Sequence, residues 1–153
     1  MKKILMTLAL VFASQMAFCQ TIDEVLEKVK ALPNAQYQEI SKEMMTFALA
    51  QINDEPTKKA MQKVESMTMG MVSSPTEETR AAFIDIVSSL KNRYNKVTEE
   101  QEEGKKVFVF SDTDDAGKPL GLVIGASENE GCQIIYFKGN VGLEDLEALG
   151  NLK

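Results

Sequence analysis

The chain has 153 residues, of which 44% are hydrophobic and 26% are charged; these proportions indicate one globular domain and exclude a disordered, collagen-like or polytopic membrane protein. Its 17 Lys and Arg against 23 Asp and Glu give a net charge of −6, and an acidic chain without a basic run argues against nucleic-acid binding. His is absent, which excludes Ser-His-Asp and Cys-His catalytic machinery and any metal site with a His ligand.

Residues 1–19 have the pattern of a Sec signal peptide. Two lysines precede the apolar run 4–13, which is shorter than the ~20 residues of a membrane span. Ala17 and Cys19 are the small residues that a cleavage site requires at its −3 and −1 positions. We therefore expect cleavage after Cys19 and export of residues 20–153 as a single domain, periplasmic or secreted, with no transmembrane span.

The alternative is a lipoprotein with Cys19 as the lipidated residue. Such a site requires a small residue directly before the Cys, and this chain has Phe18 there. Cleavage after Cys19 leaves Cys132 as the single cysteine of the mature chain, so an intramolecular disulfide is excluded. Cys132 lies in an apolar run without a neighbouring basic residue, which predicts a buried thiol and not a reactive one.

The sequence pattern predicts mainly helices in the first half of the exported chain. A capping box at Thr21 and Glu24 starts a helix over 21–31, and a short extended piece over 37–40 leads into a second helix over 41–53. We expect Asp54-Glu55-Pro56 to end that helix. Alternation over 61–72 predicts a strand whose methionine face is buried, and Ser74, with Pro75 after it, is the expected cap of a helix over 75–94.

The second half has a period of two, which predicts strands. They fall at 97–102, a polar edge strand, and at 107–110, 120–126 and 132–137, and a short helix at 143–149 follows. The connections are too short for crossovers, so the strands form an antiparallel meander. The predicted fold class is α+β, with a C-terminal β-meander and helices packed mainly on one face of an antiparallel sheet.

The C-terminal pattern of a hydrophobic strand, the turn Gly139-Asn140 and then Leu143-Glu144-Asp145-Leu146 resembles the DUF4252 family of exported proteins from Bacteroidota. The segments 40–44, 106–110, 122–124 and 134–138 extend the resemblance over most of the exported chain. Gly142 stands where many members of the family carry Ser or Thr. The resemblance implies an envelope protein and assigns no reaction, cofactor or site residue.

Met67, Met69 and Met71 form an M-x-M-x-M run. On a strand their thioethers point to one side, and soft sulfur ligands suit Cu(I). The alternative is that methionine fills an irregular part of the core. A Cu(I) site at these three residues therefore stays a minor hypothesis beside core packing.

The segment 112–117 has Asp at positions 1 and 3 and Gly at position 6 of a calcium loop. Val123 stands at position 12, where an EF-hand has its bidentate Glu, so an EF-hand is excluded. A weak Ca²⁺ contact is the remaining hypothesis of metal binding at this loop. The alternative is a hairpin loop in which Asp and Gly satisfy the turn geometry.

Glu99, Glu100, Glu102 and Glu103 make the strand over 97–102 acidic. On a strand these carboxylates alternate between both faces, which opposes the convergent pair that a glycosidase needs. A charged, solvated edge is the expected structure, and the four glutamates could also form a docking surface for a basic partner.

The chain has no catalytic motif, and we expect no enzyme and no cofactor. The sequence favours a non-enzymatic domain that binds an envelope protein or polymer through its sheet or its acidic edge. The alternative function is a small-ligand or Cu(I)-binding protein that uses the methionine-rich strand. A hydrolase that relies on carboxylates alone is the least favoured class.

Overall fold

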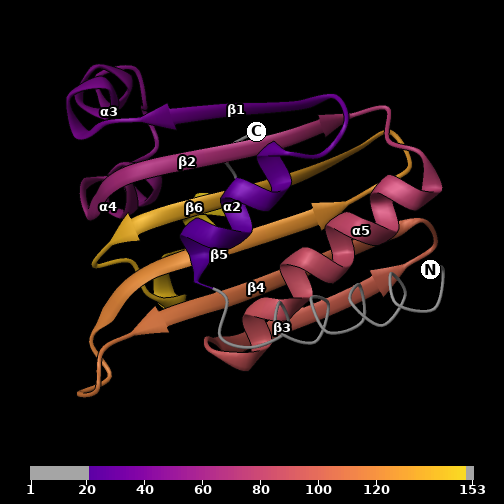
Figure 1. Ribbon diagram of the computed structural model, residues 1–153. Helices are drawn as coiled ribbons and strands as arrows, with labels where there is room; N and C mark the ends of the chain where they lie inside the picture. Colours follow the sequence, from indigo (N-terminus) through magenta and orange to yellow (C-terminus); the bar gives the residue numbers. More distant parts are fainter. Residues whose placement is uncertain (1–20, 151–153) are drawn as a thin grey trace, which may run out of the picture.

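The computed structural model describes residues 21–150, whose centre is one antiparallel sheet of six strands in the order β1-β2-β6-β5-β4-β3 (Figure 1). The predicted signal peptide at 1–19 lies outside the described residues. The strands are β1 Ala35–Ile40, β2 Val64–Ser73, β3 Asn95–Glu102, β4 Lys105–Thr113, β5 Pro119–Ser127 and β6 Gly131–Gly139. The two outer strands are β1 and β3, so the predicted edge position of the acidic strand is confirmed.

The predicted α+β class and the C-terminal β-meander are both confirmed. Strands β3 to β6 follow one another along the chain and across the sheet, and β2 joins this meander by pairing with β6. Residues directly opposite in antiparallel strands point to the same face of the sheet. The register therefore shows on which of the two faces each side chain lies. We call the side that carries Val72, Ile134 and Phe110 the first face, and the side that carries Met69 and Ile135 the second face.

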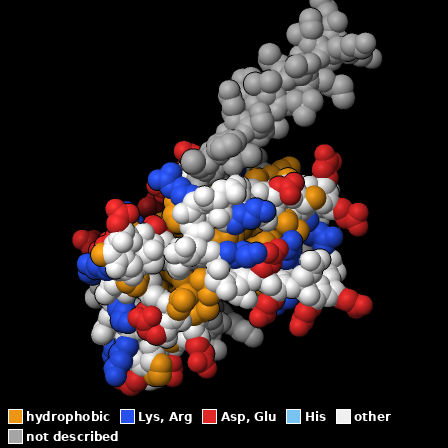
Figure 2. Space-filling model, turned by 90° about the horizontal axis from the view of Figure 1, so that it is seen from below, with side chains coloured by type: hydrophobic (Ala, Val, Ile, Leu, Met, Phe, Trp, Pro, Cys, Tyr) orange, Lys and Arg blue, Asp and Glu red, His pale blue; other side chains and the backbone are white. Residues whose placement is uncertain are grey.

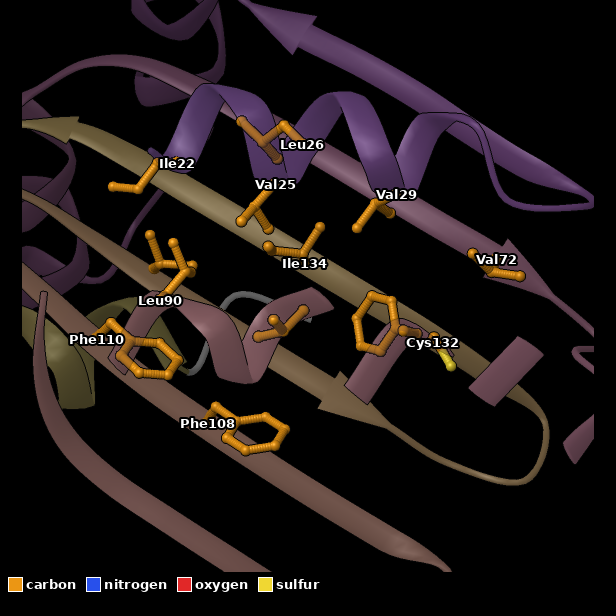
Figure 3. Close-up of a cluster of buried hydrophobic side chains, with 13 residues drawn as sticks. Ile22, Val25, Leu26, Val29, Val72, Leu90, Phe108, Phe110, Cys132 and Ile134 are labelled. Carbon is orange, nitrogen blue, oxygen red and sulfur yellow. The ribbon is translucent and has the colours of Figure 1, made fainter. Parts of the chain in front are cut away.

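Two helices cover the first face: α2 over Ile22–Lys30, and α5 over Glu77–Ser88, which continues into the 3-10 helix η1 over Ser89–Asn92. The predicted start of α2 is confirmed, because the Thr21 hydroxyl accepts a hydrogen bond from the Glu24 N–H at 3.2 Å. Figure 3 shows the apolar side of α2 directed at the sheet. The first core is made of Ile22, Val25, Leu26, Val29, Val72, Phe83, Val87, Leu90, Phe108, Phe110, Val123, Cys132 and Ile134.

Shorter helices cover only one end of the second face. They are α3 over Lys42–Leu49, α4 over Glu55–Gln62, and the pair η2 over Leu143–Asp145 and α6 over Leu146–Gly150; together we call them the helical lobe. The second core is made of Met45, Ala60, Met61, Val64, Val109, Leu122, Phe137, Val141 and Leu149. The helices, expected mainly on one face, are therefore divided: the two longest on the first face and the lobe on the second.

The prediction missed α4, because it assigned Asp54-Glu55-Pro56 only to the end of the preceding helix. The segment also starts the next one: Asp54 is its N-cap and accepts a hydrogen bond from the Thr57 N–H at 3.0 Å. Hydrogen bonds from the Thr57 hydroxyl and then from its N–H lower the pKa of Asp54. Proline is tolerated in the first turn of a helix, where its missing N–H costs nothing. The strand predicted from residue 61 therefore begins only at Val64.

The predicted cap of α5 was also wrong by two residues. Thr76 and not Ser74 is the N-cap, and its hydroxyl accepts a hydrogen bond from the Thr79 N–H at 3.1 Å. Ser74 has a φ of +47° and belongs to the turn before the helix. The α-helix ends at Ser88, and the chain continues as 3-10 helix to Asn92, short of the predicted end at residue 94.

The expected burial of the methionine face of β2 was wrong. Thr68, Gly70 and Val72 point to the first face and are buried, whereas Met67 and Met69 are half-buried and Met71 is 39% exposed. The error arose because Met67, Met69 and Met71 are more hydrophobic than the intervening Thr68 and Gly70. The helices, however, approach the face with the smaller side chains, and this packing decides which face is covered.

Candidate functional site

The part of the second face that the helical lobe leaves uncovered is the candidate site. It lies toward the end of β2, the start of β6 and the end of β5. We call it the open face, and it consists of Met69, Met71, Ile124, Ala126, Gln133 and Ile135. Met71 is exposed and the other five side chains are half-buried. Each comes from a regular strand, so the sheet fixes the backbone positions of these residues.

The open face is uncharged. In the four central strands, positions 67–71, 107–111, 122–126 and 133–137 place only Met, Val, Ser, Leu, Ile, Ala, Gln and Phe on the second face. Gln36 and Gln38 of β1 lie beside Met71 and Met69 and continue this uncharged surface to the edge of the sheet. In a chain with 26% charged residues, the lack of charge on this partly uncovered face makes it the candidate site.

Two shallow hollows border the open face. One, of about 200 Å³, is lined by Gln36, Tyr37, Gln38, Met69 and Met71. The other, of about 260 Å³, lies at the end of β2, where Met71, Ala126 and Gln133 contribute to its wall together with Glu128 and Glu130 of the β5–β6 turn. Met71 takes part in both, which makes it the most central exposed side chain of this region.

The three residues of the M-x-M-x-M run lie on one side of β2, as the spacing predicted, but in different surroundings. Met67 packs against the second core, whereas Met69 and Met71 belong to the open face. Across the strand pair they lie opposite Ile40, Gln38 and Gln36 respectively. The Cu(I) hypothesis for Met67, Met69 and Met71 stays a prediction.

The acidic strand does not present one acidic surface. Glu99 points to the first face, opposite Phe108, whereas Glu100 and Glu102 point to the second face and Glu103 lies in the turn. Lys96 and Lys106 form ion pairs with Glu99 at 2.9 and 3.1 Å. Hydrogen bonds from these two amines lower the pKa of Glu99, and the bond from Lys96 has the larger effect. Figure 2, which views the molecule from the bottom of Figure 1, shows acidic and basic side chains interspersed on that side.

The loop that resembles the start of a calcium site is a tight turn held by its own aspartate. Asp114 Oδ1 accepts hydrogen bonds from the Ala116 N–H at 2.9 Å and from the Lys118 N–H at 2.8 Å. Gly117 has a φ of +83°, which glycine adopts without strain. Within residues 21–149, no group of three His, Cys, Asp or Glu side chains is placed to hold a metal ion. The hairpin-loop interpretation accounts for these residues.

The sequence model of the family described as "domain of unknown function (DUF4252)" matches residues 21–149, that is, nearly all of the described chain. The chain belongs to the DUF4252 family. No curated protein and no solved structure matches it. None of the helices described in this DUF4252 domain has the length and apolar character needed to cross a membrane.

The thiol of Cys132 in this DUF4252 domain is buried, as the sequence predicted. Cys132 is 2% exposed and lies on the first face, with its Sγ 3.5 Å from the Ser127 hydroxyl. Burial raises the pKa of the Cys132 thiol, and the hydrogen bond with Ser127 opposes this rise. A raised pKa reduces the thiolate fraction at neutral pH, so Cys132 belongs to the core.

A group of titratable side chains at the start of α2 was missed by the sequence reasoning. The Ile22 N–H donates a hydrogen bond to the Tyr94 hydroxyl at 3.2 Å, and Asp112 and Tyr136 lie close enough for their charges to interact. Burial raises the pKa of Tyr94 and of Asp112, and raises the pKa of Tyr136 to about 12. These residues come from three separate segments, so no local spacing connects them. Of the three residues, Tyr94 fastens the start of α2 through its bond with Ile22.

The raised pKa of Tyr136 predicts a loss of stability in alkali. The folded state holds the phenol proton to about pH 12, whereas an unfolded chain releases it near pH 10. The stabilisation is therefore complete below about pH 10 and is lost as the pH rises from there toward 12. We expect urea unfolding to show a steeper fall of the free energy of unfolding over this interval in the native protein than in Tyr136→Phe. Equal slopes would contradict the assignment.

Proposed function

We propose that this DUF4252 domain is a non-catalytic, exported binding domain and that it binds another cell-envelope component, protein or polymer, through the open face. The observation that carries the proposal is the absence of any charged side chain on this half-uncovered surface, which is built from the described central strands. Leaving apolar surface in water is unfavourable by about 25 cal/mol for each Å². A partner that covers the open face recovers this free energy.

The amide side chains of the open face favour recognition of a polar main chain or a polymer with hydroxyl groups in addition to apolar contacts. Gln36, Gln38 and Gln133 surround the two methionines, and each amide both donates and accepts hydrogen bonds. Methionine is unbranched and flexible, so Met69 and Met71 adapt to differently shaped partners. This combination of adaptable apolar side chains and amides supports binding, and it offers no acid, base or nucleophile for a reaction.

The open face is favoured over the acidic edge as the docking surface. Two lysines neutralise Glu99, and Lys105 forms a further ion pair with Glu128 at 2.9 Å beside the same hairpin. A basic partner would have to displace these amines to reach Glu99 and Glu128, whereas Glu100, Glu102 and Glu103 are exposed and take part in none of the ion pairs of the described residues. The role proposed from the sequence for Glu99, Glu100, Glu102 and Glu103 in partner binding stays a prediction, of lower weight than the open face.

Site-specific photo-crosslinking tests the proposal directly. A photoreactive residue in place of Met71 is expected to give one reproducible adduct in the native host. The same residue in place of Lys91, an exposed side chain of η1, is the matched control and is expected to give none. In Ile135→Lys, crosslinking from position 71 should fall by about 10-fold, because a buried unpaired charge would oppose docking.

The control for folding is the melting temperature of each variant, because Ile135 is half-buried. Equal crosslinking from positions 71 and 91, or an adduct that Ile135→Lys leaves unchanged in a folded protein, would contradict binding through the open face. Loss of the adduct in Glu100→Lys, with Ile135→Lys still active, would transfer the docking surface to the acidic edge.

A further inference from the structure

The two edges of the sheet are built differently. In β3, four of eight residues are charged, and a bulge interrupts the register between Lys96 and Thr98. Charged side chains and bulges protect an edge strand from pairing with another chain. In β1 only Glu39 is charged, no proline is present, and the register with β2 is regular. Figure 1 shows β1 along the outer border of the sheet, so this edge lacks the protection that β3 has.

Hydrogen-bonding groups of β1 point away from the sheet. The Ser73 N–H donates to the Asn34 carbonyl at 3.5 Å, which directs that carbonyl toward β2. Backbone groups alternate in direction along an extended strand, so the N–H and C=O groups of Tyr37 and Glu39 face outward, as does the Ala35 carbonyl. The described residues provide no backbone partner for these groups, because β1 pairs only with β2.

A second exposed feature lies beside the same edge. Met44 and Phe47 of α3 are 54% and 80% exposed, and they lie on the side of the helix away from the buried Met45. Helix α3 begins two residues after β1 ends, and its inner side packs on α4 and β2. The exposed Met44–Phe47 pair therefore lies away from α4 and β2.

We propose that two copies of the chain pair through β1, antiparallel about a two-fold axis at Tyr37, so that their sheets become one continuous sheet. In this register Tyr37 lies opposite Tyr37 of the second copy, and Glu39 lies opposite Ala35. The Tyr37 N–H donates to the Tyr37 carbonyl of the second copy, and the Glu39 N–H donates to the Ala35 carbonyl. Symmetry repeats each bond. All the donors and acceptors used are groups that face outward.

The sequence of β1 fits a second copy because the register places no two like charges of β1 opposite each other. Outside β1, the Lys30 amine lies 4.9 Å from the centre of the Tyr37 ring in each copy. Glu39, the one charge of β1, faces Ala35, and the two Tyr37 side chains form an aromatic cross-strand pair, a favourable combination. A closed two-fold arrangement also leaves only the protected β3 edges at the ends of the joined sheet. This interface is distinct from the open face, so a dimer would present two binding surfaces.

Sedimentation equilibrium of the purified protein over the micromolar range tests the inference first. The expected result is a mass of two chains, and a mass of one chain at every concentration would overturn the inference. Tyr37→Pro removes an outward N–H without removing a bond to β2, and it is expected to weaken the dimer by about 10-fold or more. Tyr37→Phe keeps the N–H and should leave the dimer unchanged. A folded Tyr37→Pro that stays fully dimeric would also overturn it.

Disulfide trapping tests the register. In a chain with Cys19 and Cys132 replaced by Ala, Tyr37→Cys is expected to oxidise to a covalent dimer, because directly opposite Cα atoms lie about 5.5 Å apart. Gln38→Cys is the matched control: its counterpart is diagonal, at more than about 7 Å, and should not be trapped. More efficient trapping through Gln38→Cys would contradict the two-fold axis at Tyr37.

A monomeric protein that still crosslinks from position 71 would refute the dimer and leave the proposed function standing.

Discussion

Replacing Gly139 by Ala is expected to lower the free energy of unfolding by about 3 kcal/mol or more, because the added methyl group has no room. Gly139 has a φ of +142°, and a Cβ at this position would lie 2.3 Å from the Lys63 carbonyl oxygen and 2.9 Å from the Glu65 nitrogen. Both are backbone atoms at the junction of α4 and β2. Neither can yield unless the pairing of Gly139 with Val64 is disturbed. Urea unfolding of the two proteins measures the difference.

Gly117→Ala is the matched control for the crowding argument. Gly117 also has a positive φ, +83°, but a Cβ there would meet no atom within 4 Å. Its substitution should cost only the unfavourable left-handed conformation, about 1–2 kcal/mol. Comparable losses in both variants would show that backbone conformation, and not contact with Lys63 and Glu65, makes Gly139 necessary.

The strands of the second half could be predicted because their signals are local. Alternating side chains in 107–110 and 132–137, with glycines at the turns, fix both the strands and their antiparallel pairing. The same holds for the start of α2, where Thr21 lies three residues before Glu24 and caps the helix within one turn. In each case the residues that decide the structure lie within a few positions of one another.

The lobe was less predictable because its signals are ambiguous at short range. Asp54-Glu55-Pro56 suits the end of one helix and the beginning of another, and only the packing of Ala60 and Met61 into the second core selects the beginning. Helix α3 carries apolar residues on both sides, with Met45 buried and Phe47 exposed. Its periodicity therefore gave no indication of which side meets the sheet.

The open face could be predicted only in part. The alternation of Met67, Met69 and Met71 placed three thioethers on one side of a strand, and the structure has that arrangement. Which side the helices cover depends on the path of α2 and α5 over β2, a long-range property that the sequence of β2 does not contain. The edge position of β1 could not be predicted either. It follows from the pairing of β2 with β6, which are far apart in the sequence and leave β1 at the border of the sheet.

Replacing Asp145 by Ala is expected to lower the free energy of unfolding by about 2–3 kcal/mol, because it leaves a buried donor unpaired. Asp145 is 7% exposed, and its Oδ2 accepts a hydrogen bond from the Gly142 N–H at 3.1 Å. The Lys63 amine also donates to both carboxylate oxygens, at 3.0 and 3.2 Å. Asp145 thereby joins the η2–α6 turn to the end of α4. Thermal and urea unfolding measure the loss.

Two further variants separate the contributions of Asp145. Asp145→Asn keeps an oxygen that can accept from the Gly142 N–H and loses the charge, so it should cost less than Asp145→Ala. Lys63→Met removes only the ion pairs of Lys63, whose side chain is 38% exposed, and should cost about 1 kcal/mol or less. Gly142 has no hydroxyl with which to cap the turn, and Asp145 supplies the bond from inside it. A Lys63→Met variant as unstable as Asp145→Ala would instead make the ion pair the main support of this end of the fold.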